Sequence, residues 1–275
     1  MGNNMFYYVN APRASMKKSP QEKSETVSET YFSEEVELLD NQKGWAFIET
    51  ITDSYRGWVS ESILTPKKNS FLSDPSTLVA TVNRCSAHVY NEEDTIYGPI
   101  ITLPFESKLK AVHFKDLKSR WIEVLLIDGR KGYIQRGDIT LKSTLKNLFE
   151  LGELSLQFLN LPYTWGGRSS FGYDCSGFTQ MLYRQMGVHL PRDAKEQISY
   201  KNFSTTSLEK LKTGDLLFWG QSSDLIGHVG MYLTNKRFIH ATVAENAPYI
   251  RVSYLSDPEW NGCGKWSYRA FKTLN

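Results

Sequence analysis

The chain contains few cysteines and no long apolar run. Its three cysteines, Cys85, Cys175 and Cys263, lie far apart in 275 residues and include no C-x-x-C pair. This distribution is typical neither of a disulfide framework nor of a zinc-binding signature. No window approaches the roughly 18 apolar residues that a membrane helix needs, so we expect no membrane span.

An excess of charge of one sign is lacking as well. The 32 basic and 30 acidic residues give a formal net charge of +2, which argues against nucleic acid or another polyanion as the main partner. The N-terminal run MGNNMFYYVNAPRASMKK has neither the basic nor the apolar region of an export signal. We therefore expect a cytoplasmic protein, or a periplasmic or secreted one if a signal was removed or export is unconventional.

A hairpin motif rich in aromatic residues occurs twice in the first half of the chain. The run GWAFIET at 44–50 leads to RGWV at 56–59, and RWIEVLL at 120–126 leads through Asp128-Gly129 to KGYI at 131–134. Asp-Gly between two β-like runs is a strong hairpin signal. A repeat of about 65–75 residues fits a small all-β barrel. We predict two such barrels, at 1–66 and 67–140; the simplest interpretation of the repeat alone is two barrels with tryptophans in their cores.

The pattern becomes helical after residue 140. A helix is predicted behind Ser143 or Thr144 as N-cap, ending before Pro162. Its apolar residues recur at helical spacing, namely Leu145, Leu148, Phe149, Leu151, Leu156 and Leu159. A second helix is predicted from Cys175 to Met186, stopped by Gly187. Asp193 and Glu196 form a candidate capping box for a third.

Strands dominate the remainder of the third domain, which we place at 141–275. The predicted strands are 215–219, 228–233, 237–241 and 266–271. Helices followed by an antiparallel run of strands favour an α+β fold.

Cys175 gives the clearest local indication of a catalytic residue. At the first turn of a helix, unpaired backbone N–H groups and the helix dipole favour a thiolate, so the pKa of this thiol is expected to fall. The small residues Ser176 and Gly177 leave access to the sulfur, and the Cys175 N–H can help to bind an oxyanion. Cys85 and Cys263 have no such context and are expected to be structural.

Two histidines follow Cys175 on adjacent predicted strands, with Asn235 near the tip of the hairpin that joins them. Residues at similar depth on neighbouring strands can meet, so His228 and His240 can form a base and its orienting partner beside a thiol nucleophile. Glycines around His228 are expected to permit close approach of a substrate. The remaining histidines, His88, His113 and His189, have no such context.

Zinc is an alternative use of Cys175, His228 and His240. A closed structural zinc site needs a fourth ligand, and no further cysteine or histidine lies nearby in the sequence. We therefore expect no metal and no cofactor.

Several motifs of the third domain resemble those of the NlpC/P60 cysteine peptidases. They are LPYTWGG (161–167), FGYDCSGF (171–178), GDLLFW (214–219), HVGMY (228–232) and FIHA (238–241), in the order of that family. The hairpin repeat resembles bacterial SH3-like (SH3b) domains, which often accompany cell-wall hydrolases. The resemblance implies a papain-like α+β catalytic domain preceded by two SH3-like barrels.

The same resemblance implies roles for individual residues. Cys175 is the expected nucleophile, His228 the general base, and His240 the residue that orients it. Asp174, Ser176 and Tyr163 match positions that shape the substrate site, with Asp174 meeting the free amine of an N-terminal L-alanine. The implied substrate is a peptidoglycan stem peptide, cleaved between γ-D-glutamate and a diamino acid, usually diaminopimelate. Ala194 departs from the family pattern, which often has serine there, and so removes one possible hydrogen bond.

Two other functions use the same sequence features. A thiol-dependent amidase or acyltransferase would share the nucleophile and the thioester intermediate. A non-catalytic cell-wall-binding protein would use only the barrels, but it has no chemical need for Cys175, His228 and His240 together. We therefore predict a cysteine peptidase that acts on peptidoglycan-derived peptides.

Overall fold

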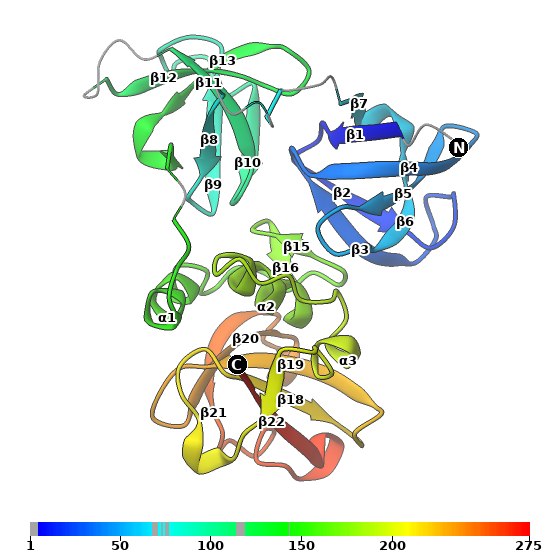
Figure 1. Cartoon of the computed structure of the whole chain (residues 1–275), viewed down its shortest axis with the longest axis vertical. Coiled ribbons are helices and arrows are strands. Elements are labelled where there is room, and N and C mark those ends of the chain that lie inside the picture. Colours follow the sequence, from blue (N-terminus) through cyan, green and yellow to red (C-terminus); the bar gives the residue numbers. More distant parts are fainter. Residues whose placement is uncertain (1–4, 68–70, 73, 75–76, 114–118, 143) are drawn as a thin grey trace. The chain divides into compact units, whose positions relative to one another are not determined.

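The computed structural model describes residues 5–67, 71–72, 74, 77–113, 119–142 and 144–275. Its contacts divide the chain into two compact units (Figure 1). The first comprises residues 1–144 and 169–171, and the second comprises 145–168 and 172–275. Among the described residues, no helix combines the length and the apolar character needed to cross a bilayer.

The first unit contains two antiparallel sheets with the same topology. Within its described residues the strand orders are β3-β2-β6-β5-β4-β1-β7 and β10-β9-β13-β12-β11-β8-β14. Adding seven to each strand number of the first sheet gives the second, so the internal repeat is confirmed as a repeat of topology. The first sheet consists of β1 (Met5–Val9), β2 (Arg13–Lys17), β3 (Thr26–Tyr31), β4 (Glu35–Gln42), β5 (Trp45–Thr50), β6 (Arg56–Ser60) and β7 (Leu64–Pro66). The second consists of β8 (Leu78–Val82), β9 (Ser86–Tyr90), β10 (Ile101–Pro104), β11 (Lys108–His113), β12 (Trp121–Leu125), β13 (Lys131–Gln135) and β14 (Ile139–Thr140).

Both predicted hairpins are present, as β5–β6 and β12–β13. Buried residues alternate with partly exposed ones along β5 and β12, because successive side chains of a strand point to opposite faces. The repeated tryptophans lie on the partly exposed face, so the simplest interpretation, with tryptophans in the cores, does not hold. Instead, Trp58 packs on Phe47 with ring centroids 5.1 Å apart, and Trp121 packs edge-on against Tyr90 at 5.4 Å.

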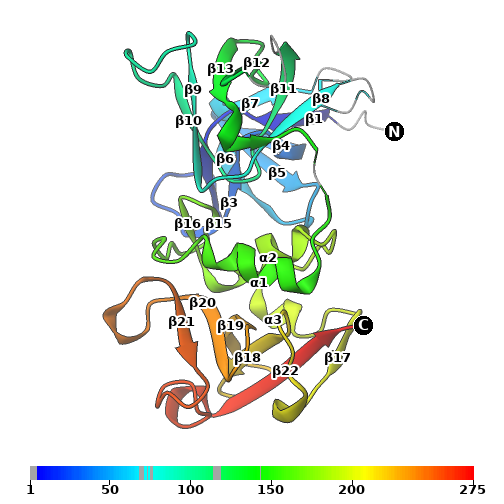
Figure 2. The same ribbon diagram turned by 90° about the vertical axis from the view of Figure 1, so that its left-hand side faces the viewer.

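The second unit is an α+β domain, as predicted. Its six-stranded sheet has the order β17-β22-β18-β19-β20-β21, and helices α1 and α2 lie on one side of it (Figure 2). The sheet strands are β17 (Phe203–Thr205), β18 (Leu216–Gly220), β19 (Ile226–Tyr232), β20 (Arg237–Thr242), β21 (Tyr249–Tyr254) and β22 (Tyr268–Leu274). The helices are α1 (Leu148–Leu156), α2 (Cys175–Arg184) and α3 (Ala194–Gln197), and β15 (Arg168–Ser169) pairs with β16 (Gly172–Tyr173).

Helix α1 differs from its prediction at the N-cap and in its apolar face. Asn147 caps the helix, and its side chain and Glu150 form a reciprocal capping box. Ser143 lies outside the described residues, and Thr144 precedes the helix by several residues. Of the six apolar residues that marked the predicted helix, only Leu151 is fully buried. Their spacing was helical, but most of them do not form the buried face.

Helix α2 begins at Cys175, as predicted. Its residues Phe178, Met181 and Leu182 are fully buried, and α2 packs against β19 and β20. The chain leaves the helix through Gly187, whose φ of +76° falls in the left-handed region that glycine adopts without strain. Asp193 is the N-cap residue of α3, but its side chain makes no cap hydrogen bond, so the predicted capping box is absent.

Candidate active site

Cys175 lies where α2 meets the sheet. The carboxylate of Asp174 caps the helix by accepting a hydrogen bond from the Gly177 N–H at 2.7 Å. The Cys175 side chain is nearly enclosed, and the backbone N–H of Val229 on β19 donates to its sulfur. Because Val229 directly follows His228, this contact brings the thiol to the part of β19 that carries the first predicted histidine.

The thiol of Cys175 is protonated in the resting protein. Burial and the neighbouring Asp174 carboxylate raise the pKa of Cys175 to about 12, against the lowering effects of the Val229 N–H and the Arg192 guanidinium. The expected fall in this pKa is therefore wrong for the free protein. A helix N-terminus favours the thiolate by a modest amount, and here desolvation together with a like charge outweighs it.

The two predicted histidines meet across β19 and β20. The Nε2 atom of His228 lies 2.7 Å from the Nδ1 atom of His240, and both side chains are buried. The hairpin that joins their strands turns through Asn235 and Lys236, whose φ angles of +52° and +60° are left-handed. His240 in turn places its Nε2 atom 3.0 Å from the Oγ atom of Ser253 on β21.

Aromatic rings enclose His228. Its imidazole centroid lies 4.8 Å from the ring of Trp260, 5.7 Å from Trp219 and 5.9 Å from Trp266. Burial, with a further contribution from the charge of Lys265, lowers the pKa of His228 to about 3. Burial and neighbouring positive charge hold the pKa of His240 well below its ordinary value as well. Both imidazoles are therefore neutral near pH 7.

The glycines beside His228 make room for protein side chains. A Cβ atom on Gly230 would lie 2.9 Å from the Phe238 ring and 3.1 Å from Cβ of His240, and one on Gly227 would lie 3.2 Å from the Trp266 ring. Close approach of a substrate to this backbone stays a prediction. The lack of a side chain at both glycines allows these rings to pack against β19.

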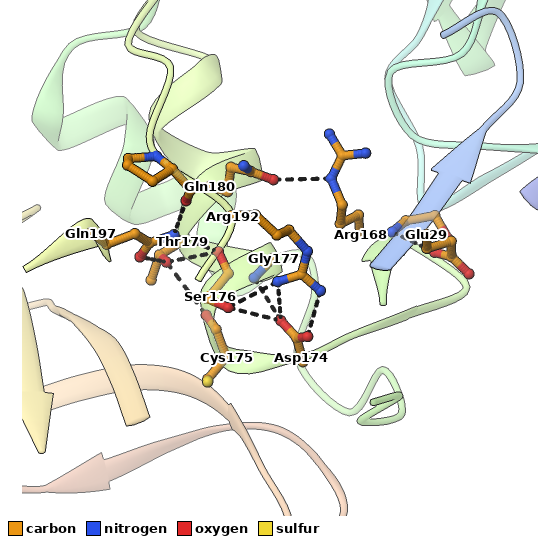
Figure 3. Close-up of polar contacts among 12 residues, drawn as sticks. Glu29, Arg168, Asp174, Cys175, Ser176, Gly177, Thr179, Gln180, Arg192 and Gln197 are labelled. Carbon is orange, nitrogen blue, oxygen red and sulfur yellow. Dashed lines mark hydrogen bonds and ion pairs between the residues drawn. The ribbon is translucent and has the colours of Figure 1, made fainter. Parts of the chain in front are cut away.

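A buried ion pair lies beside Cys175 (Figure 3). Arg192 donates from Nη2 to Oδ2 of Asp174 at 2.6 Å and from Nη1 to Oδ1 at 3.1 Å. The Oγ atom of Ser176 accepts from Arg192 Nη1 at 2.9 Å and donates to Asp174 Oδ1 at 3.3 Å. The sulfur of Cys175 points away from this pair in Figure 3. Two of the predicted substrate-site residues, Asp174 and Ser176, thus share one guanidinium.

A buried glutamine ties α3 to the first turn of α2 (Figure 3). Gln197 donates from Nε2 to the carbonyl oxygen atoms of Ser176 and Pro191 at 3.0 and 2.9 Å. Its Oε1 atom accepts from the Thr179 hydroxyl at 2.9 Å. All of its strong polar groups have partners, so Gln197 supports the position of the residues that follow the thiol.

Tyr163 is the third predicted substrate-site residue. Its backbone N–H donates to the Pro248 carbonyl at 2.7 Å, which fixes the start of the segment before β15. Burial raises the pKa of Tyr163, and the charges of Cys175 and Asp174 raise it further. All six predicted site residues belong to the second unit, and the Tyr163 side chain is linked to Cys175 and Asp174 by this electrostatic interaction.

The sequence did not identify Arg192, Gln197, Ser253 and the tryptophans around His228 as parts of the site. A buried arginine next to a predicted N-cap carboxylate gives no local pattern, because the two are 18 residues apart. Among the described residues, no group of three or more His, Cys, Asp and Glu side chains is suited to hold a metal ion.

Comparison with known proteins identifies two regions of similarity. A family model described as the NlpC/P60 family matches residues 160–262, and one described as a bacterial dipeptidyl-peptidase Sh3 domain matches residues 16–64. A γ-D-glutamyl-L-lysine dipeptidyl-peptidase of Bacillus cereus is 26% identical over 84% of this chain and 71% of its own length. Dipeptidyl-peptidase 6 of Lysinibacillus sphaericus is 26% identical over 90% of this chain and 91% of its own length.

A solved structure has the same overall fold. The crystal structure of an NlpC/P60 family protein from Bacillus cereus superposes with a TM-score of 0.80 at 21% identity, and the match covers 93% of this chain and 96% of the other. The similarity therefore includes the barrels as well as the domain that holds Cys175.

Proposed function

We propose that this chain, which is a cysteine peptidase of the NlpC/P60 family carrying a bacterial SH3 domain, cleaves the amide bond between γ-D-glutamate and a diamino acid in peptides derived from peptidoglycan. The contact between His228 and His240 supports the catalytic part of this proposal, because it leaves Nδ1 of His228 available to accept the proton of the Cys175 thiol. Two relatives that bear on the bond cleaved are named γ-D-glutamyl-L-lysine dipeptidyl-peptidases.

The proposed reaction begins with proton transfer inside the buried pair. The Nε2 atom of His228 is engaged by His240, so Nδ1 accepts the thiol proton as the sulfur of Cys175 attacks the carbonyl carbon of the scissile amide. The Cys175 N–H donates to the oxyanion that forms. His228 then gives the proton to the leaving amine, and a thioester to Cys175 remains.

Hydrolysis of the thioester completes the cycle. His228 accepts a proton from water while the water oxygen attacks the thioester carbonyl, and the thiolate leaves and takes the proton back. The neutral resting thiol and imidazole of this site suit a reaction in which the proton moves during attack. They do not require a preformed ion pair.

Recognition of a free N-terminal L-alanine is proposed for Asp174. Oδ1 already accepts from the Gly177 N–H, Arg192 and Ser176, whereas Oδ2 accepts from Arg192 alone among the residues that the structure describes. A carboxylate oxygen can accept more than one hydrogen bond, so Oδ2 has room for an ammonium donor. Because Arg192 already offsets the charge of Asp174, an ammonium gains less here than it would from a lone carboxylate.

Incubation with defined peptides tests the bond and the substrate. We expect L-Ala-γ-D-Glu-meso-diaminopimelate to yield L-Ala-γ-D-Glu and free diaminopimelate, detected by mass spectrometry, and Cys175→Ala protein to yield neither. Parallel incubation with the L-lysine peptide reports the diamino acid preferred. The same stem linked to muramic acid should be cleaved poorly, because it has no free ammonium for Asp174.

The outcomes separate the alternatives. Intact peptides after incubation with active-site-intact protein would contradict the proposed bond. Transfer products that appear only when a second amine is supplied would favour an acyltransferase over a hydrolase. Equal cleavage of free and muramic-acid-linked stems would remove the proposed role of Asp174 without affecting the proposed nucleophile.

A further inference from the structure

A buried serine extends the pair of histidines by one more group. Both nitrogens of His240 have a partner, Nδ1 with His228 Nε2 at 2.7 Å and Nε2 with Ser253 Oγ at 3.0 Å. His240 is fully buried and Ser253 is 4% exposed. At such burial the Nε2 atom of His240 depends on the protein for a hydrogen-bond partner, and Ser253 provides it.

The sheet register brings the serine to this place. Ser253 on β21 is directly opposite Phe238 of β20, and His240 is opposite Arg251. Residues two apart on a strand share a face, so Ser253 and His240 are diagonal neighbours on the same face of the sheet. The hydrogen bond therefore follows from backbone pairing and does not depend on a flexible loop.

The direction of the hydrogen bonds is forced once His228 takes up the thiol proton. An imidazolium donates from both nitrogens, so His228 Nε2–H must donate to Nδ1 of His240. A neutral His240 that accepts at Nδ1 carries its proton at Nε2, and this N–H then donates to Ser253 Oγ. Without that oxygen, a buried N–H would have no acceptor in the state that forms during attack.

We propose that Ser253 is a positioning residue for the reaction, which acts by accepting the Nε2–H of His240 and so keeps Nδ1 of His240 as the acceptor for protonated His228. This inference rests on the proposed roles of Cys175 and His228. It adds a third strand to the machinery, because Cys175, His228, His240 and Ser253 come from α2, β19, β20 and β21 in turn.

The effect should fall on the chemical step. Ser253→Ala should lower kcat by about 10- to 100-fold, the range expected when a buried donor loses its partner. KM should change little, because Ser253 is buried and contacts His240. Ser253→Thr retains a hydroxyl and should recover most of the rate. Ser155→Ala is the matched control, because Ser155 is a buried serine as well, but its hydroxyl donates to the Gly152 carbonyl within α1.

A double-mutant cycle separates positioning from general support of the fold. The Oδ1 atom of the asparagine in His240→Asn can still accept from His228, but the side chain does not extend to Ser253. Ser253→Ala should therefore cost almost nothing in the His240→Asn background. A full loss of rate that persists in this background would overturn the proposal, as would wild-type kcat in Ser253→Ala protein.

A readout without substrate distinguishes this inference from the proposed function. The rate of alkylation of Cys175 by iodoacetamide depends on transfer of the thiol proton to His228, whatever peptide the enzyme cleaves. We expect Ser253→Ala to slow it and Ser253→Thr to restore it. Slowed alkylation with no cleavage of γ-D-glutamyl peptides would uphold the role of Ser253 and contradict only the substrate. Unchanged alkylation would contradict the role of Ser253.

Discussion

Arg192 and Asp174 form a two-bonded ion pair in which the side chains are only 2% and 11% exposed. The pair connects the segment before α3 with the N-cap of the helix that carries the thiol. A buried pair of this kind adds little net stability, but loss of one partner leaves the other charge desolvated and unpaired. Its members should therefore differ strongly from surface ion pairs in their response to substitution.

Replacing Arg192 should destabilise the protein substantially. We expect Arg192→Met to lower the free energy of unfolding by about 3–5 kcal/mol, the range for a buried pair that loses one partner. Urea unfolding followed by fluorescence measures this. Lys195→Met is the control, because Lys195 lies 3.8 Å from Asp193 with its side chain 64% exposed, and such pairs contribute less than about 1 kcal/mol. Equal losses in both variants would contradict the importance of burial.

Removing both members of the pair should be less harmful than removing Arg192 alone. In Arg192→Met/Asp174→Asn protein no charge is left buried, so part of the stability should return. The return is incomplete, because asparagine still caps α2 but makes weaker hydrogen bonds than a carboxylate. If the double variant were no more stable than Arg192→Met protein, the buried charge of Asp174 without its partner would not be the cause of the lost stability.

The resting protein should contain no thiolate at Cys175 near neutral pH. The raised pKa of about 12 implies a protonated thiol throughout the neutral pH range. The ultraviolet difference absorbance between wild-type and Cys175→Ala protein should therefore lack the thiolate signal between about pH 6 and pH 8. A clear thiolate signal in this range would indicate a preformed thiolate–imidazolium pair.

Stability should fall as pH is lowered from near 6.5. The pKa of His228 is about 3 in the folded protein against an ordinary value of 6.5, and that of His240 is lowered as well. Between these values the unfolded chain binds protons that the folded protein does not, so acid favours unfolding. Within this pH window each histidine lowers the free energy of unfolding by roughly 1.4 kcal/mol for each pH unit of acidification. Above pH 6.5 this loss of stability is absent.

Urea midpoints measured from pH 7 to pH 4 test this slope. His228→Gln should flatten it, whereas His189→Gln, at an exposed position, should not. An unchanged slope in His228→Gln protein would show that other groups cause the acid sensitivity.

Adding one methyl group to β19 should disturb the histidine pair. Gly230→Ala would place Cβ within 2.9 Å of Phe238 and 3.1 Å of His240 Cβ, and overpacking of this kind costs about 1–3 kcal/mol. We expect lower stability together with a reduced kcat, because the ring of His240 must shift. Gly137→Ala has no atom within 4 Å of the added Cβ and should leave kcat unchanged.

Local signals in the sequence predicted much of this architecture. The hairpins, the start of α2 at Cys175 and the strands that carry both histidines each follow from a short pattern of residue types. Strand β21 was not predicted, although its sequence YIRVSY is rich in β-branched and aromatic residues. The place of α1 was roughly right, but apolar spacing alone does not show which residues are buried.

The missed parts of the site depend on pairing over long distances. Arg192 can pair with Asp174 only when the segment before α3 packs beside α2. Ser253 contacts His240 only because of the pairing register of β20 and β21. The raised pKa of Cys175 has the same origin, since the helix N-terminus is a local feature whereas burial is a property of the folded domain. The sequence pattern shows the helix N-terminus, which lowers the pKa of the thiol, but it does not show the burial that raises it.

The shared strand order of the two barrels has a consequence for folding. Two neighbouring segments with one topology can exchange equivalent strands, such as β5 for β12, and so form a misassembled pair. Divergence of their side chains works against this exchange. Ala46 and Ile48 of β5 correspond to Ile122 and Val124 of β12, all fully buried, so a swapped strand would leave a void in one core and overfill the other. The difference in volume between equivalent core positions therefore helps each strand return to its own barrel.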